Sequence, residues 1–198
     1  MQQESFSAQD SLKIIQTMIE KSKQNISDQS HYFLLWGWAA FIGFTGQYIL
    51  KVIMNNPYHY HIWWISAVCV VITILFNLRQ SKSSKLKTYT EDNMGHLWAG
   101  LSIAFFVCCI IFTKLGWQNC YPFFMLLYGT GTFISGRLIR FSPLVVGGIA
   151  SFLLAAVSVW ANGDLQILLA ACAILFSYII PGHFLHQKYH RSKSNAIV

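Results

Sequence analysis

The sequence has few charged residues, and acidic residues are the scarcest among them. Charged residues make up 11% of the chain, whereas soluble domains contain about 25%. The seven Asp and Glu residues all lie outside the long apolar runs. Proton- and sodium-coupled carriers usually place an ionisable residue at membrane depth, so this absence argues against a pump-like coupled transporter.

Signatures of catalysis and cofactor binding are also missing. The chain contains no paired carboxylates, no metal-hydrolase motif and no nucleotide-binding loop. The five cysteines form no CxxC pair and are typical of small apolar packing residues. The sequence therefore favours a protein that is not an enzyme, and it predicts no catalytic residue and no cofactor.

Long apolar runs are what the sequence has in abundance. A hydrocarbon core of about 30 Å needs roughly 20 apolar residues in a helix, and helices satisfy their own backbone hydrogen bonds in lipid. The sequence therefore predicts an all-α, six-helix transmembrane bundle. The six predicted spans are Tyr32–Leu50, Ile62–Leu78, Leu97–Phe112, Tyr121–Ile139, Leu144–Trp160 and Leu165–Ile180.

The basic residues predict the orientation of these spans. Alternate non-membrane segments carry twelve Lys and Arg on one side and two, Lys51 and Lys114, on the other. The positive-inside rule therefore places both termini in the cytoplasm, against an anionic inner leaflet. We expect a bacterial inner membrane, because the chain is small and shows no sorting segment. No compact soluble part remains to bind nucleic acid, so the net charge of +7 is assigned to the membrane surface.

Three regions follow from these spans. Residues 1–31 form a cytoplasmic amphipathic helix and linker, 32–182 the transmembrane domain, and 183–198 a basic, His-rich cytoplasmic tail. Within 10–26, apolar residues recur at helical spacing between lysines. This helix either lies on the inner leaflet or docks a partner protein. A homo-oligomer is left open.

Two short strings in the spans resemble each other. LLWGWAAFIGF, Leu34–Phe44, aligns with LLYGTGTFISG, Leu126–Gly136, and both strings keep small residues four apart. They lie in the first and fourth predicted spans, so a duplicated three-helix unit would be inverted, an arrangement common in transporters. The alternative is that two apolar helices share a limited composition, because the other spans do not align convincingly.

Small residues and two arginines mark a candidate region around the fourth and fifth spans. Its residues either line a solute path or permit close helix packing, with the arginines meeting an anionic group or extending to headgroups. The candidate residues are Gly37, Gly43, Gly129, Gly131, Ser135, Arg137, Arg140, Gly147 and Gly148.

Histidines supply the second candidate site. Pro181 and Gly182 are expected to break the last helix, and beyond them His183, His186 and His190 share one face if a helix resumes. Three imidazoles at this spacing can hold a metal or respond to pH. The alternative is a plain basic interfacial tail. On the outer side, His59 and His61 alternate as on an extended segment, where they form either a ligand pair or a plain link.

These observations favour a small permease or channel-like protein for a small solute. The alternative is a membrane-embedded sensor or partner subunit that signals through its N-terminal helix and C-terminal tail. Deleting residues 1–26 separates the two hypotheses, because a permease should retain flux whereas a partner protein should lose its complex.

Overall fold

The computed structural model describes residues 31–81 and 89–194. The described residues form helices and links, with no strand among them. The N-terminal span covers His31–Ile53, and its last turn is the π-helix η1 (Ile49–Ile53). The other elements are η2 (His59–Trp63), α2 (Trp64–Ser81), α3 (Tyr89–Leu115), η3 (Trp117–Asn119), α4 (Tyr121–Leu138), α5 (Ser142–Ser158), α6 (Gly163–Ile174), η4 (Leu175–Ile179) and α7 (Ile180–Ser194).

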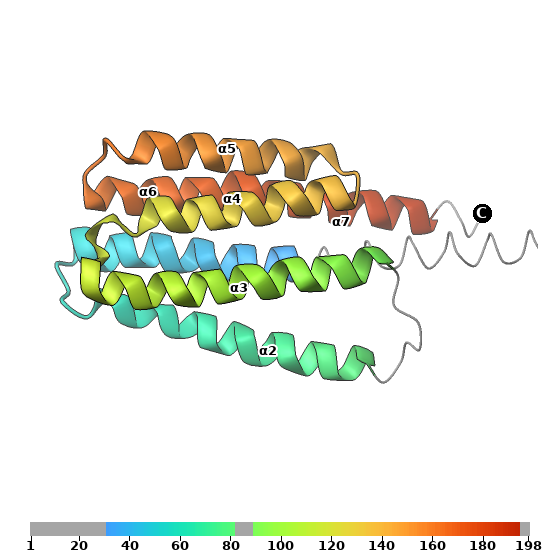
Figure 1. Cartoon of the computed structure of the whole chain (residues 1–198), viewed down its shortest axis with the longest axis horizontal. Coiled ribbons are helices and arrows are strands. Elements are labelled where there is room, and N and C mark those ends of the chain that lie inside the picture. Colours follow the sequence, from blue (N-terminus) through green and yellow to red (C-terminus); the bar gives the residue numbers. More distant parts are fainter. Residues whose placement is uncertain (1–30, 82–88, 195–198) are drawn as a thin grey trace, which may run out of the picture.

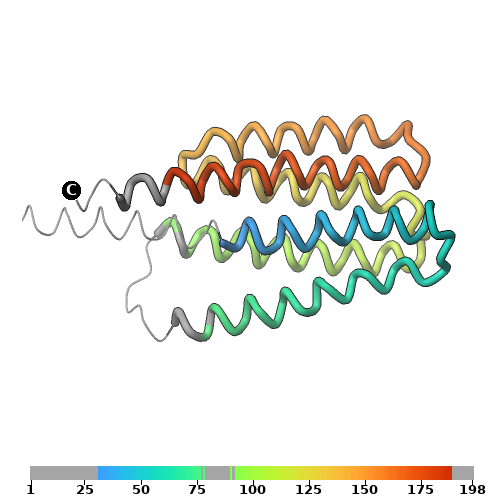
Figure 2. The backbone as a smooth tube through the Cα atoms, turned by 180° about the vertical axis from the view of Figure 1, so that it is seen from behind, coloured from blue at the N-terminus to red at the C-terminus, as the bar shows by residue number. Residues whose placement is uncertain are grey.

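The helices lie side by side and alternate in direction (Figure 1). Helix α6, η4 and α7 continue one another, so the described part of the chain runs six times between two ends of the bundle. We call these the Asp164 end, where α6 begins, and the Arg140 end, where α4 turns into α5. Both views place α5 at one edge and α2 at the opposite edge, with the N-terminal span and α3 between α2 and the other helices (Figure 2). The predicted helix within residues 10–26 lies outside the described residues.

Among the described residues, four helices are long and apolar enough to cross a membrane, by length and composition. They are His31–Ile53, His59–Phe76, Asp92–Leu115 and Gly163–Lys188. The apolar helix Ser142–Ser158 is shorter, and α4 contains glycines, threonines and Arg137 that lower its hydropathy. The chain is thus all-helical with several membrane-type helices. Six crossings, and the inverted repeat, stay predictions.

The exposed surface of α2 and α3 is strongly apolar. Val68, Phe76, Phe106 and Ile110 are each more than half exposed. Soluble monomers rarely expose contiguous apolar surface of this kind, so these faces are those of a membrane-embedded protein.

The core lies among α4, α5 and the last helix. Leu144, Ile167 and Ile174 are almost fully buried there, and Phe44 and Tyr178 belong to the same cluster. Small residues let the helices approach closely where lipid supplies no hydrophobic drive. This tight group of helices holds the N-terminal span against η4.

Pro181 does not break the last helix, contrary to the sequence prediction. The helix continues from Gly163 to Ser194 through the π-helix η4, in which the Ile180 N–H bonds to the Leu175 carbonyl five residues earlier. Proline lacks an N–H and crowds the preceding turn, and a widened π-turn is one way a helix accommodates such a disruption. Pro181 is itself fully buried, so packing offsets the lost bond. The predicted domain boundary at 182/183 therefore falls inside a continuous helix.

Candidate functional site

The glycines of α4 and α5 permit the two helices to touch through their backbones. A Cβ atom on Gly148 would lie 2.9 Å from the Gly129 carbonyl oxygen and 2.8 Å from the Phe133 nitrogen. On Gly147 it would lie 2.6 Å from the Phe176 carbonyl oxygen of η4. No side chain fits at such distances without moving backbone. At these glycines the backbone of α5 therefore lies against α4 on one side and against η4 on the other.

The remaining predicted glycines contact several different elements. A Cβ on Gly37 would meet Tyr178, one on Gly43 would meet Trp63, and one on Gly131 would meet Leu101 and Trp98. Gly37 and Gly129 correspond in the two similar strings, yet they face unrelated partners. The similarity of the strings is therefore not matched by similar packing at these positions.

Ser135 and the two arginines lie toward the Arg140 end but in different surroundings. Ser135 is fully buried, whereas Arg137 and Arg140 are exposed. Arg140 adopts a positive φ of 53° in the turn between α4 and α5. Lys188 of α7 lies 5.6 Å from the centre of the Phe141 ring, beside this turn. The two arginine side chains therefore lie at the surface, whereas the Ser135 side chain lies in the protein interior.

The histidines of the last helix contact rings of the N-terminal span. The His186 ring centre lies 5.5 Å from that of His31, and the His183 ring centre 6.4 Å from that of Trp38. Among the described side chains, no three His, Cys, Asp or Glu gather in a way that could hold a metal ion. The side chain of His190 lies outside that described part, so the three-histidine site stays a prediction.

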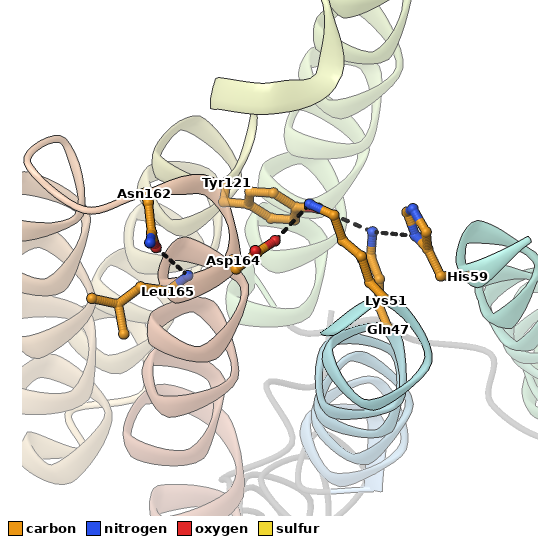
Figure 3. Close-up of polar contacts among 7 residues, drawn as sticks. All are labelled: Gln47, Lys51, His59, Tyr121, Asn162, Asp164 and Leu165. Atoms are coloured by element: carbon orange, nitrogen blue, oxygen red, sulfur yellow. Dashed lines mark hydrogen bonds and ion pairs between the residues drawn. The ribbon is translucent and has the colours of Figure 1, made fainter. Parts of the chain in front are cut away.

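A polar cluster joins three elements at the Asp164 end. Gln47 is 6% exposed, and its Nε2 donates to the Tyr121 hydroxyl at 3.0 Å and lies 3.4 Å from His59 Nδ1. The Trp63 indole N–H donates to Gln47 Oε1 at 2.9 Å. We call Gln47, His59, Trp63 and Tyr121 the Gln47 cluster. It ties the N-terminal span to η2 and to the start of α4 (Figure 3).

An ion pair lies beside the Gln47 cluster. Lys51, one turn beyond Gln47, pairs with Asp164 of α6 at 2.7 Å, and both side chains are more than a third exposed. Asn162 caps α6 by accepting the Leu165 N–H at 3.0 Å, a usual role for asparagine at this position. Four helical segments therefore meet through polar contacts at this end (Figure 3).

Aromatic rings from three other helices surround Tyr178 inside the bundle. Its ring centre lies 5.7 Å from that of Phe33, 6.2 Å from Trp98 and 5.6 Å from Tyr128. We call these four residues the Tyr178 cluster. Tyr178 itself belongs to the π-helix η4, and π-turns inside α-helices often occur at functional sites. The rings are edge-to-face or tilted, as aromatic side chains prefer.

The Tyr178 hydroxyl is buried and has no hydrogen-bond partner among the described residues. The same holds for the hydroxyls of Ser135 and Thr45. Most described helix hydroxyls are satisfied by a backbone carbonyl: Ser177 donates to Ala173, Thr132 to Tyr128 and Ser151 across helices to Met125. A buried polar group without a partner is costly and needs an explanation.

Neither Tyr178 nor Gln47 was singled out from the sequence. A tyrosine three residues before a proline in an apolar helix was the available signal for Tyr178. His59 and His61 lie on the 3₁₀-helix η2 and not on an extended segment. Their rings take different partners, since His61 stacks on Tyr58 while His59 faces Gln47.

Comparison with known proteins gives no relative. The chain matches no protein-family model, no curated protein and no solved structure. The candidate function therefore depends on the geometry alone.

Proposed function

We propose that the chain is an integral protein of a bacterial inner membrane that crosses it six times, with both termini in the cytoplasm. The charge distribution supports this orientation, because Arg137, Arg140 and Lys188 lie toward the Arg140 end. Basic residues favour the cytoplasmic side. At the Asp164 end Trp160 is 85% exposed, as expected for an indole at the membrane interface.

Helices α4 and α5 serve as the fourth and fifth crossings in this proposal. Eighteen residues in α4 give a length of about 27 Å, close to the thickness of a hydrocarbon core. The polar Thr132 and Ser135 of α4 are fully buried, so they do not face lipid. Its low hydropathy therefore reflects a helix surrounded by protein.

In this proposal the protein is a permease or channel-like protein for a small solute. The solute binds at the Tyr178 cluster. The observation that carries this proposal is the buried Tyr178 hydroxyl without a partner among the described residues. Tyr178 lies 15 residues into the last helix, or about 22 Å from its start at the Asp164 end. A polar group at that depth has no bulk water to satisfy it, and a bound solute would complete its hydrogen bonding.

The surroundings of Tyr178 favour a neutral solute with an apolar body and one hydrogen-bonding group. Aromatic rings pack against the Tyr178 ring, and no Asp or Glu occurs in the six predicted spans. A charged solute at this depth would need a partner of opposite charge. Ser135 supplies a second buried hydroxyl on a facing helix, α4.

Native mass spectrometry of the full chain, released gently from its own membrane, tests the proposal. A small molecule of defined mass should be retained by the wild type and by Tyr60→Phe, a control at an exposed tyrosine, but lost from Tyr178→Phe. The retained molecule is then assayed for flux in proteoliposomes.

Two other results would contradict the permease proposal. Lipid alone on the wild-type protein would remove the evidence for a solute. A co-released protein that disappears when residues 1–26 are deleted would instead identify a partner subunit.

A further inference from the structure

The orientation of the Gln47 amide is fixed by Trp63. The indole N–H can only donate a hydrogen bond, so the atom 2.9 Å from it must be the amide oxygen. The amide nitrogen therefore faces the Tyr121 hydroxyl and His59 Nδ1. Exchanging the two amide atoms would place two donors against each other at Trp63.

This orientation determines the protonation state of His59. The Gln47 Nε2 group is a donor, so His59 Nδ1, 3.4 Å away, must accept. Nδ1 accepts only in the neutral ring that carries its hydrogen on Nε2. Protonated histidine has N–H groups at both nitrogens, and an N–H would then point at the Gln47 amide hydrogens. The Gln47 cluster therefore requires neutral His59.

The segment that this cluster holds is weakly attached elsewhere. Cys69 is the one buried side chain among those described in α2. In contrast, η2 packs directly against the N-terminal span. The Trp63 ring centre lies 4.8 Å from that of Phe44, and the Trp63 ring also packs against Gly43. Helix α2 therefore stays beside the bundle largely through η2.

Other charged and titratable groups lie around His59. Burial lowers the pKa of His59, the positive charge of Lys51 lowers it further, and Asp164 raises it. The Lys51 and Asp164 side chains are paired with each other. Tyr121 shares the Gln47 amide nitrogen, and the Tyr60 ring centre lies 5.9 Å from that of His59. His61 lies farther along η2 against Tyr58. His59 is thus the histidine whose charge acts directly on the cluster.

We infer that protonation of His59 disrupts the Gln47 cluster and releases η2 and α2 from the rest of the bundle. The contact is complete at and above the ordinary histidine pKa of about 6.5, and it is lost as the pH falls through the lower pKa that burial gives His59. The position of α2 then depends on the pH of the compartment at the Asp164 end. This inference does not depend on the proposed solute.

Fluorine NMR of the full chain in lipid nanodiscs tests the first step. The protein is labelled with 5-fluorotryptophan, and the Trp63 resonance is identified by its loss in Trp63→Phe. Between about pH 8 and pH 5, where histidine titrates, this resonance should shift in one step. His59→Asn should abolish the shift, because its amide oxygen accepts at every pH. His61→Asn is the matched control and should retain it.

Alkylation of Cys69 by N-ethylmaleimide, resolved by peptide mass spectrometry, tests the release of α2. The extent of Cys69 modification in the wild type is divided by that in His59→Asn at the same pH. The effect of pH on the reactivity of the thiol is then the same in both proteins and cancels in this ratio. The ratio should be near one at about pH 8 and rise several-fold at about pH 5. A constant ratio, or a Trp63 shift that persists in His59→Asn, would overturn the inference. His59→Gln replaces His59→Asn if that variant does not fold.

Discussion

The Trp63 indole donates to the Gln47 amide oxygen over 2.9 Å, sixteen residues back along the chain. This hydrogen bond links η2 to the N-terminal span. Because Gln47 also reaches Tyr121 of α4, one buried amide aligns two distant parts of the bundle.

Replacing Gln47 with leucine should destabilise the protein by about 1–3 kcal/mol, because the Trp63 N–H and the Tyr121 hydroxyl lose their partner. The measurement is the free energy of unfolding in detergent, followed by circular dichroism. Asp164→Asn is the control, since its ion pair with Lys51 is exposed and should contribute less than about 1 kcal/mol. Equal losses from both variants would contradict a special role of Gln47.

Gly147→Ala should destabilise the protein by about 1–3 kcal/mol, because its Cβ would press against the Phe176 carbonyl of η4. Gly100→Ala, in the open face of α3, meets nothing within 4 Å. It should be neutral or stabilising by up to about 1 kcal/mol, as alanine favours the helix. Thermal unfolding of both variants measures the difference. A well-tolerated Gly147→Ala would mean that α5 and η4 are less closely packed than the contact implies.

Tyr178→Phe should leave the solute-free protein as stable as the wild type, or more stable by about 1 kcal/mol. The change removes a buried hydroxyl that lacks a partner in the described structure. Ser151→Ala is the contrasting control, because that hydroxyl donates to the Met125 carbonyl across helices and its loss should destabilise. Unfolding is measured after extensive detergent exchange. Similar destabilisation by both changes would show that Tyr178 has a partner within the protein.

The apolar runs predicted the helices well because run length alone decides whether a helix can cross a hydrocarbon core. Helix α6 begins at Gly163, two residues before the predicted span, because Asn162 caps it by accepting the Leu165 N–H. Pro181 misled the prediction. A prediction from local propensity considers only the N–H that proline lacks. In the structure, the Pro181 ring is buried and the helix continues through the π-helix η4 just before it.

The candidate site could be predicted only in part. The glycine pattern left a solute path and close helix packing open, and in the structure Gly147 and Gly148 lie against the backbones of neighbouring helices. Tyr178 and Gln47 were not distinguishable from other polar residues, because their importance depends on what surrounds them. Phe33, Trp98 and Tyr128 come from three different helices, and no local pattern relates them to Tyr178.

A high-resolution structure of the full chain in lipid nanodiscs, prepared without stripping bound molecules, tests whether Tyr178 binds a solute. We expect non-protein density within hydrogen-bond distance of the Tyr178 hydroxyl, among the rings of the Tyr178 cluster. A Tyr178 hydroxyl that donates to a protein carbonyl, with no density beside it, would contradict the proposed solute site.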